Sequence, residues 1–424
     1  MRKLLQKILR ILSKAVVKKY NPIVIGITGS VGKTSTKEAV FAVLKNKFNA
    51  VKNEENLNNE FGFPVAILMP GSKCNLDDYY ADSKLRTLIF YFHILKNGFR
   101  LLLTKTEYPD LLVFEYSAEK PGDIDYLVEI VPSNIGIVTG IGEIPVHVEY
   151  YSGPEQVAKE KAKLVQTLSP NGLAILNHDD WVVFNMKDLS KAEVMTFGFD
   201  PHASVKASDA RFFIEEIKEA AAGISFKLNY EGKSVPFRLP NALGRHQIYA
   251  ALAAAAVGIH FGMNLIEIAE ALEQLEFPKQ RMKLMKGIKN SLIIDDSYNA
   301  SPLSTHAALD TLKEFGDKAI VKGGLGRKIA VLGDMKELGI FTEKAHRLIG
   351  NLAGERAEYL FTVGPAAKFI ADSAFNQLPK ENIMSFGSSD EAGGYLKGFI
   401  QEGDIVLVKG SRAMKMEKIV ELLI

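Results

Sequence analysis

Residues 23–40 read IVIGITGSVGKTSTKEAV, which is an apolar strand, a glycine-rich turn and the beginning of a helix. The common phosphate-binding loop has a glycine five positions before the glycine of its Gly-Lys-Ser/Thr ending. Here the ending is Gly32, Lys33 and Thr34, but the position of that first glycine holds Ile27. The order strand, glycine loop, helix is the context that phosphate binding requires. The stretch therefore predicts a nucleotide-binding α/β domain with an unusual form of the loop, rather than a mere tight turn.

The groups in this loop suit the phosphates of ATP. Successive N–H groups of a glycine-rich turn point inward and form an anion site, to which the following helix adds its positive N-terminal end. The Lys33 side chain can reach the outer phosphates, and the Thr34 hydroxyl can hold Mg²⁺. The expected nucleotide contacts are Gly29, Ser30, Gly32, Lys33, Thr34 and Ser35.

Two further side chains follow other predicted strands. Glu115 ends the run LLVFE, and His147 follows GIVTGIGEIPV. Ligands of a doubly wound sheet gather at the carboxyl ends of its strands, so both side chains could ligate a second Mg²⁺. Taken singly, each also fits a solvated loop residue. The helix that contains Lys159, Lys161 and Lys163 reads as a charged face, and spacing alone selects none of the three.

Strand-like and helix-like runs alternate along most of the chain, which is the pattern of a parallel sheet with helices on both faces. Short strands around 203–240 indicate a small antiparallel addition, and the alternation restarts near residue 283 with five further strands. We predict a P-loop doubly wound parallel-sheet ATPase domain over residues 22–280. A smaller Rossmann-like α/β domain is predicted to follow over residues 281–424.

The composition is that of an ordinary globular protein: of 424 residues 47% are hydrophobic and 24% charged, and the net charge is +2. So small a charge gives no support to nucleic-acid binding. The single cysteine, Cys74, excludes an internal disulfide bond and fits a reducing cytoplasm. No apolar run reaches the roughly 18 residues that span a bilayer.

Residues 1–21 depart from this charge balance. Their first twenty positions hold seven basic residues and no acidic one, with apolar residues at helical spacing. This predicts a basic amphipathic helix, which either packs on the protein's own apolar surface or contacts an anionic membrane surface. The apolar and basic segment 85–106 has two similar readings: a core helix hairpin, or a surface that pairs with the first helix or with lipid.

Taken together, the motifs resemble the Mur ligases, which are ATP-dependent amide-forming enzymes of bacterial cell-wall synthesis. Within that family the resemblance is closest to the MurF branch, which joins D-alanyl-D-alanine to a UDP-N-acetylmuramoyl tripeptide. The loop GITGSVGKTST is the family's form of the phosphate loop. The other supporting stretches follow in the family's order and are NLNNEFGFPVAIL (56–68), HVEYYSGPEQVAKEKAKL (147–164), LGRHQIYAALAAA (243–255), DDSYNASPLSTHAALDTL (295–312), RKIAVLGDMKELG (327–339) and LVKGSRAMKMEKIV (407–420).

The resemblance implies ATP, two Mg²⁺ ions and a set of site residues. Lys161 would take up CO₂ and become a carbamate that supports the ions, and Arg281 and Asp296 would clasp ATP from the C-terminal domain. The implied catalytic residues are Lys33, Glu115, His147 and Lys161, and the implied metal ligands are Thr34, Glu115, His147 and Lys161.

The resemblance also implies two groups of substrate contacts. Asn58, Asn59 and Glu60 would line the cleft near the sugar-peptide substrate. The group that would face the incoming amine and its carboxylate is Tyr298, Asn299, His346, Lys409, Ser411 and Arg412. The chain departs from the family where two asparagines are replaced by Gln247 and Ala250, so we expect different contacts to adenine.

The implied activity is ATP-dependent formation of a peptide bond through an acyl phosphate in the cytoplasm. The implied partners are small molecules: a cell-wall precursor and a D-Ala-D-Ala-like amine. Because the phosphate loop begins at residue 26, we expect the separate domain that holds UDP in this family to be absent, with the helix of residues 1–21 in its place. One alternative is a ligase for a substrate on a lipid or another carrier, at the inner face of the membrane. The other is a non-catalytic nucleotide-binding scaffold subunit, and no feature indicates an oligomeric state.

Overall fold

The computed structural model describes the chain except residues 1, 55–56, 72–83, 217–220, 319 and 322–323, so Cys74 lies outside the described residues. Its larger sheet has the strand order β2-β3-β1-β4-β5-β6-β7-β8-β9. The strands are β1 (Ile23–Thr28), β2 (Ala50–Lys52), β3 (Leu111–Glu115), β4 (Ile135–Val138), β5 (Leu173–Asn177), β6 (Glu193–Gly198), β7 (Val205–Glu216), β8 (Ala221–Tyr230) and β9 (Lys233–Pro240).

The strands from β2 to β6 run parallel, and β7, β8 and β9 pair antiparallel at one edge. This confirms the predicted parallel sheet and its antiparallel addition. Because side chains alternate along a strand, Ile25 packs on one face of the sheet while Val24 packs on the other. Each face is covered by helices, as a doubly wound sheet requires.

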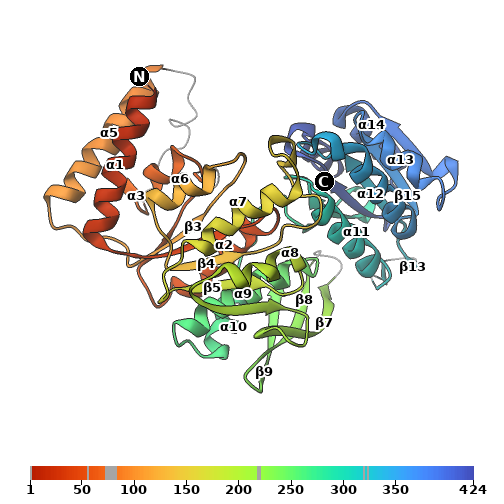
Figure 1. Ribbon diagram of the computed structural model, residues 1–424. Helices are drawn as coiled ribbons and strands as arrows, with labels where there is room; N and C mark the ends of the chain where they lie inside the picture. The colour runs from red at the N-terminus through yellow and green to blue at the C-terminus, as the bar shows by residue number, and fades with distance from the viewer. Residues whose placement is uncertain (1, 55–56, 72–83, 217–220, 319, 322–323) are drawn as a thin grey trace.

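The helices of this first unit cover both faces of the sheet (Figure 1). The face that includes Ile25 is covered by α2 (Lys33–Leu44), α9 (His246–His260) and α10 (Leu265–Glu273). On the other face and beside it lie α1 (Arg2–Tyr20), α3 (Gly62–Leu68), α5 (Lys84–Leu103), α6 (Asp123–Ile130), α7 (Pro154–Gln166) and α8 (Trp181–Phe184), with the short 3₁₀ turns η1 (Val148–Tyr150) and η2 (Asn185–Leu189).

Helices α1 and α5 lie side by side, away from the C-terminal sheet (Figure 1). Leu9, Leu12 and Val16 of α1 are buried against α3 and α5, so the helix packs on the protein's own apolar surface. Residues 85–103 of the segment 85–106 lie in one continuous helix, α5, so the predicted helix hairpin was wrong. Among the described residues, no helix combines the length and the apolar character needed to cross a bilayer.

The second sheet has the strand order β10-β11-β17-β14-β15-β16, parallel except for the antiparallel edge strand β10. The five predicted strands are present, and β10 was not predicted. The strands are β10 (Lys283–Lys286), β11 (Leu292–Asp296), β14 (Lys328–Gly333), β15 (Tyr359–Val363), β16 (Ile383–Phe386) and β17 (Ile405–Lys409), with β12 (Ile320–Val321) and β13 (Gly324–Leu325) as a separate hairpin. The predicted boundary between residues 280 and 281 stays a prediction.

Helices also cover both faces of the second sheet, and the buried apolar side chains between sheet and helices form two separate clusters. They are α11 (Pro302–Gly316), α12 (Thr342–Arg356), α13 (Lys368–Ala374), α14 (Ser389–Phe399) and α15 (Glu417–Leu423), with the short turns η4 (Ile288–Asn290), η5 (Gly339–Phe341), η6 (Lys380–Asn382) and η7 (Arg412–Met414). Both sheets therefore present the carboxyl ends of parallel strands, which is where ligands of such sheets bind.

Candidate active site

The glycine loop connects β1 to α2 between the ends of the neighbouring strands β3 and β4. The N–H groups of Ser30 and Val31 donate to the carbonyl oxygen of Gly140, at 2.7 and 3.1 Å. Gly29 has a φ of +149°, and a Cβ atom there would lie 2.1 Å from the Thr139 hydroxyl oxygen. The loop therefore follows a path along β4 that only glycine fits at this position.

Four side chains from both halves of the chain meet at the start of α2. The Thr34 hydroxyl donates to a Glu115 carboxylate oxygen at 3.0 Å, and Arg281 donates to the same hydroxyl at 3.3 Å. Burial raises the pKa of Glu115, but nearby cations, Lys33 first among them, hold that pKa below its usual value. Burial lowers the pKa of Lys33, against the opposing effect of Glu115. A buried carboxylate beside a hydroxyl group is a fitting pair of oxygen ligands for Mg²⁺.

Two residues that the sequence did not single out hold Glu115 in place. The side-chain oxygen of Asn53 accepts a hydrogen bond from the Glu115 backbone N–H at 3.0 Å. The buried Lys37 ammonium donates to the backbone carbonyl of Asn53 at 2.7 Å. Lys37 lies one helical turn after Lys33 on α2, and this spacing could have indicated that its side chain also faces the site.

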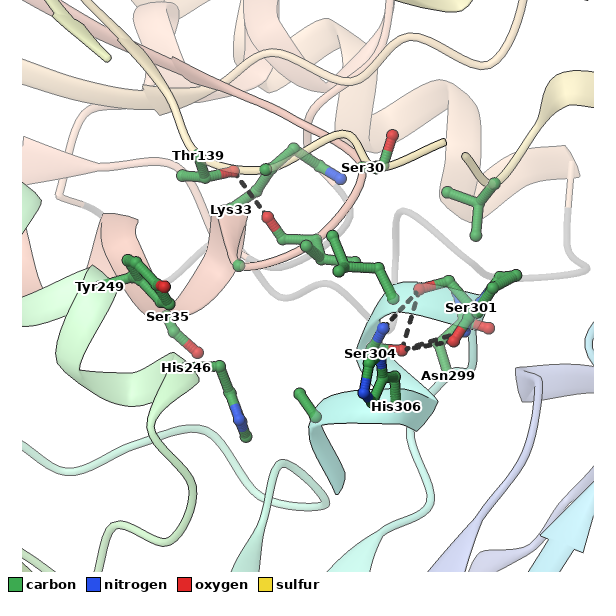
Figure 2. A pocket seen from close by; sticks show the side chains of 18 of the residues that line it. Ser30, Lys33, Ser35, Thr139, His246, Tyr249, Asn299, Ser301, Ser304 and His306 are labelled. Carbon is green, nitrogen blue, oxygen red and sulfur yellow. Dashed lines mark hydrogen bonds between the residues drawn. The ribbon is translucent and has the colours of Figure 1, made fainter. Parts of the chain in front are cut away.

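A pocket of about 870 Å³ extends from this loop to the second sheet. Figure 2 shows the Lys33 side of the pocket facing Asn299, Ser301, Ser304 and His306, which lie at the beginning of α11. Its lining therefore comes from both sheets, and a pocket of this size is typical of a small-molecule or cofactor site. Lys33, Thr34, Ser35, Asn58, Glu115, Arg281, Asp296, Tyr298, Asn299 and Lys409 are the predicted residues that line it beside Ser30 and Gly32.

One side of the pocket is lined by residues that the sequence reading missed. The Tyr249 hydroxyl donates to the carboxylate of Asp179 at 2.8 Å. The Asp180 carboxylate accepts from the N–H groups of Ile141 and Gly142 at 2.7 and 3.0 Å. Asp179 and Asp180 lie just beyond the carboxyl end of strand β5, which stops at Asn177, so the rule that ligands gather at strand ends could have found them.

The opposite side is held together by a buried ion pair. The Lys409 ammonium lies 2.5 Å from an Asp296 carboxylate oxygen and donates to the Asn299 carbonyl at 3.0 Å. Asp296 and Lys409 end the neighbouring strands β11 and β17, so the parallel register brings them together. The Arg281 guanidinium stacks over the Tyr298 ring at 4.3 Å. This side therefore presents an ordered, charged surface toward the loop.

Among the three lysines of α7, burial separates one from the others. Lys161 is 1% exposed, whereas Lys159 is exposed and Lys163 pairs with Asp125 and Glu160. Burial lowers the pKa of Lys161 to about 7, and the Lys33 charge adds to the effect. About half of a lysine population with such a pKa is neutral at pH 7, and only a neutral amine can act as a nucleophile.

His147 lies at the junction of the two halves of the chain. It has a φ of +66°, and its ring nitrogen Nδ1 lies 2.7 Å from a carboxylate oxygen of Glu337, which follows β14. In this structure its partner is thus a residue of the C-terminal half. Within the part of the chain that the structure describes, no three or more His, Cys, Asp or Glu side chains gather in a way that could hold a metal. The implied ligand role of His147 stays a prediction.

Of the predicted substrate contacts near α3, Asn58 lines the pocket. The Asn59 side chain accepts from the N–H groups of Phe61 and Gly62, at 3.1 and 2.9 Å, and so holds the first turn of α3. Glu60 is partly exposed in the same turn.

Three predicted C-terminal residues, His346, Ser411 and Arg412, are not among the residues that line the pocket, and their implied substrate contacts stay predictions. His346 is fully buried: Nε2 accepts from the N–H of Met335, and Nδ1 contacts the Thr342 carbonyl oxygen. The Ser411 hydroxyl accepts from the N–H of Lys336 at 2.8 Å. Arg412 donates to the Gln280 side chain at 3.3 Å, with its guanidinium 5.4 Å from the Tyr298 ring. His346 and Ser411 thus order the loop after β14 rather than face the pocket.

Comparison with protein families identifies the two halves of the chain. The model of the Mur ligase middle domain matches residues 96–258, and the model of the Mur ligase glutamate ligase domain matches residues 280–412. The glycine loop precedes the first of these matches.

Individual proteins match over nearly the whole chain. The UDP-N-acetylmuramoyl-tripeptide--D-alanyl-D-alanine ligase of Bacillus subtilis is 28% identical and covers 97% of this chain and 78% of its own length. The enzyme of the same name from Buchnera aphidicola subsp. Baizongia pistaciae is 30% identical, over 95% of this chain and 76% of its own. A crystal structure of MurF from Acinetobacter baumannii has a TM-score of 0.75 at 26% identity, over 97% and 79% of the two chains. MurF ligase from Thermotoga maritima, solved in complex with ADP, has a TM-score of 0.75 at 22% identity, over 98% and 83%.

Proposed function

Since the chain belongs to the Mur ligase family of ATP-dependent ligases, we propose that it joins D-alanyl-D-alanine, or a similar amine, to the peptide of a cell-wall precursor through an acyl phosphate. The observation that carries the proposal is the pocket, because the Lys33 loop lines one side and Asp296 and Asn299 line the other. Such a reaction must hold ATP, a carboxylate and an amine in one enclosed space. The relatives that carry the D-alanyl-D-alanine ligase name support this choice of substrates.

In the proposed reaction, a carboxylate oxygen of the precursor attacks the γ-phosphorus of ATP, and ADP leaves. The amine nitrogen then attacks the acyl carbon of the acyl phosphate, loses a proton and expels inorganic phosphate. The first step brings two anions together, and the cations of Lys33 and Arg281 offset their repulsion. Mg²⁺ held by Thr34 and Glu115 would supply further positive charge and align the reacting oxygens.

Lys161 contributes to this site as a carbamate. Its neutral amine adds to CO₂ and releases one proton, which converts a cationic side chain into an anionic one. The nearby Lys33 charge, which disfavours a protonated Lys161, favours the anion. The anion would add an oxygen ligand beside Glu115, which fits a second Mg²⁺.

The side of the pocket that the C-terminal half of the chain forms has two roles in the proposed mechanism. It supplies the surface around Asn299 and Lys409 on which the amine substrate is positioned, and it excludes water from the acyl phosphate. Arg281 connects the two sides of the pocket directly, because its guanidinium donates to Thr34 on the loop side and stacks on Tyr298 on the C-terminal side.

The test is release of phosphate from ATP and Mg²⁺ with D-alanyl-D-alanine and a UDP-N-acetylmuramoyl tripeptide, each omitted in turn. We expect release only when both are present, and a pentapeptide product by mass spectrometry. Lys33→Ala should lower the rate by about a hundredfold or more, because a transition-state charge contact is lost.

The matched control is Lys159→Ala, which changes an exposed lysine of α7 and should leave the rate unchanged, whereas Lys161→Ala should abolish it. ADP binding without any turnover, with several amines and with precursors on UDP or lipid carriers, would refute the ligase proposal and favour the scaffold. Turnover with another amine or carrier would refute only the choice of substrate.

A further inference from the structure

Exposed apolar side chains gather on the pair of helices α1 and α5. Each helix already buries one side against the protein, and the exposed side chains belong to another side. Those that share one face of their helix are Leu4 (63% exposed), Ile8 (38%) and Ile11 (59%) on α1, and Leu88 (68%), Phe92 (63%), Phe99 (52%) and Leu103 (82%) on α5, and Ile89 (47%) is exposed beside them on α5. We call the seven residues that share a face the apolar strip.

Helical geometry makes the strip continuous across both helices. The helices run parallel, because the Lys19 ammonium at the end of α1 donates to the carbonyls of Leu101 and Leu102 near the end of α5, and Leu12 packs against Gly98. Residues spaced by three, four or seven positions share a face of a helix, and both halves of the strip have such spacings. At about 100° per residue, each half lies beside the contact between the helices and points away from the sheet. The two halves therefore adjoin.

The charges on these helices have one sign. The sequences of α1 and α5 contain no acidic residue. Arg10 and Lys14 of α1 form ion pairs with Glu129 of α6. The exposed cations that flank the strip are Lys3, Lys7 and Lys18 on the α1 side and Lys96 and Arg100 on the α5 side. A strip of large apolar side chains is thus bordered by cations on both sides.

We propose that the apolar strip docks the protein on the surface of an anionic lipid bilayer. Leucine and phenylalanine side chains would enter the boundary between headgroups and acyl chains, while the flanking lysines reach the lipid phosphates. The charge pattern favours a bilayer over a second copy of the chain, because facing copies would bring two cationic borders together. Neither helix crosses the membrane, so the protein lies on it. This inference is independent of the ligase proposal.

The test is co-sedimentation of the full chain with vesicles of phosphatidylcholine containing 30% phosphatidylglycerol, or of phosphatidylcholine alone. We expect binding to the anionic vesicles that weakens as NaCl is raised, because salt screens the flanking cations. Lys3→Glu, Lys7→Glu and Lys18→Glu together should weaken binding by at least about a hundredfold, at roughly fivefold for each charge removed. Phe92→Ser with Phe99→Ser should weaken it by about tenfold or more.

The matched charge control is Lys233→Glu, Lys368→Glu and Lys397→Glu, three exposed lysines away from α1 and α5. The matched apolar control is Ile266→Ser with Phe375→Ser. Both controls should bind the vesicles like the unaltered protein, and thermal unfolding verifies that every variant is folded. Equal loss in the controls and the strip variants would overturn the proposal. So would absence of binding to anionic vesicles at low salt, or a dimer in sedimentation that the Phe92 and Phe99 substitutions dissociate.

Discussion

Lys161 should carry CO₂ as a carbamate at neutral pH, and the amount should depend steeply on pH. Burial lowers the pKa of its ammonium from 10.5 to about 7. At pH 7 about half of the Lys161 side chains are then neutral, against about 0.03% for an ordinary lysine. The environment of α7 thus raises the reactive fraction by a factor on the order of a thousand.

The size of this pH dependence follows from the same pKa. Between pH 8 and pH 6 the neutral fraction of Lys161 falls from about 90% to about 10%. At a fixed concentration of dissolved CO₂, carbamate should therefore fall about tenfold or more over this range, because its formation also releases a proton. The amount of carbamate thus rises with pH, whereas the reaction of a group that reacts in its protonated form would fall with pH.

The assay is ¹³C NMR of the protein under ¹³CO₂, which resolves a carbamate carbon from free bicarbonate. We expect one signal in the unaltered chain and in Lys159→Ala, and loss of that signal in Lys161→Ala. A signal that survives Lys161→Ala, or that keeps its full intensity at pH 6, would refute the reasoning from burial. Circular dichroism at both pH values establishes that the fold is unchanged.

Three further substitutions test the geometry of the site. Gly29→Ala places a side chain on a backbone with φ of +149°, and should cost about 1–3 kcal/mol in thermal unfolding and weaken ADP binding measured by calorimetry. Arg281→Lys loses the planar group that stacks on Tyr298, and should raise KM for ATP about tenfold. Asp296→Asn leaves the buried Lys409 ammonium without its carboxylate, and should cost about 3 kcal/mol in urea unfolding.

Each substitution has a control elsewhere in the chain. Gly394→Ala adds a methyl group on α14 that would have no atom of another segment within 4 Å, so it should not destabilise the protein. Asp390→Asn breaks the exposed pair with Lys418 and should cost less than about 1 kcal/mol. Arg245→Lys changes an arginine with 59% exposure and should leave KM for ATP unchanged. If test and control variants behave alike, burial and backbone geometry do not govern the site as argued.

The loop, the strand ends and the alternation of elements could be read from the sequence because they are local patterns. Gly32, Lys33 and Thr34 need only a strand before them and a helix after them, and Glu115 needs only to end a buried strand. The antiparallel strand β10 was missed because its four residues, KLMK, have no strong apolar pattern.

What the sequence could not supply is which residues from distant segments meet. Lys161 differs from Lys159 only in what surrounds it, and burial depends on the packing of the whole sheet. His147 pairs with Glu337, almost two hundred positions later in the chain, so no spacing rule could have joined them. The ring of His346 faces inward because the turn after β14 offers it a backbone N–H, which is a tertiary contact.

The bonds from the Ser30 and Val31 amides to Gly140 concern the thermodynamics of nucleotide binding. They tie the glycine loop to the residues that follow β4, so contacts within the protein hold the loop in its shape. Ordering a free loop would cost about 1–2 kcal/mol of conformational entropy for each residue fixed. Because the fold has already ordered the loop, the entropy lost when a nucleotide binds falls mainly on the nucleotide. Little of the free energy of phosphate binding is therefore needed to order the loop.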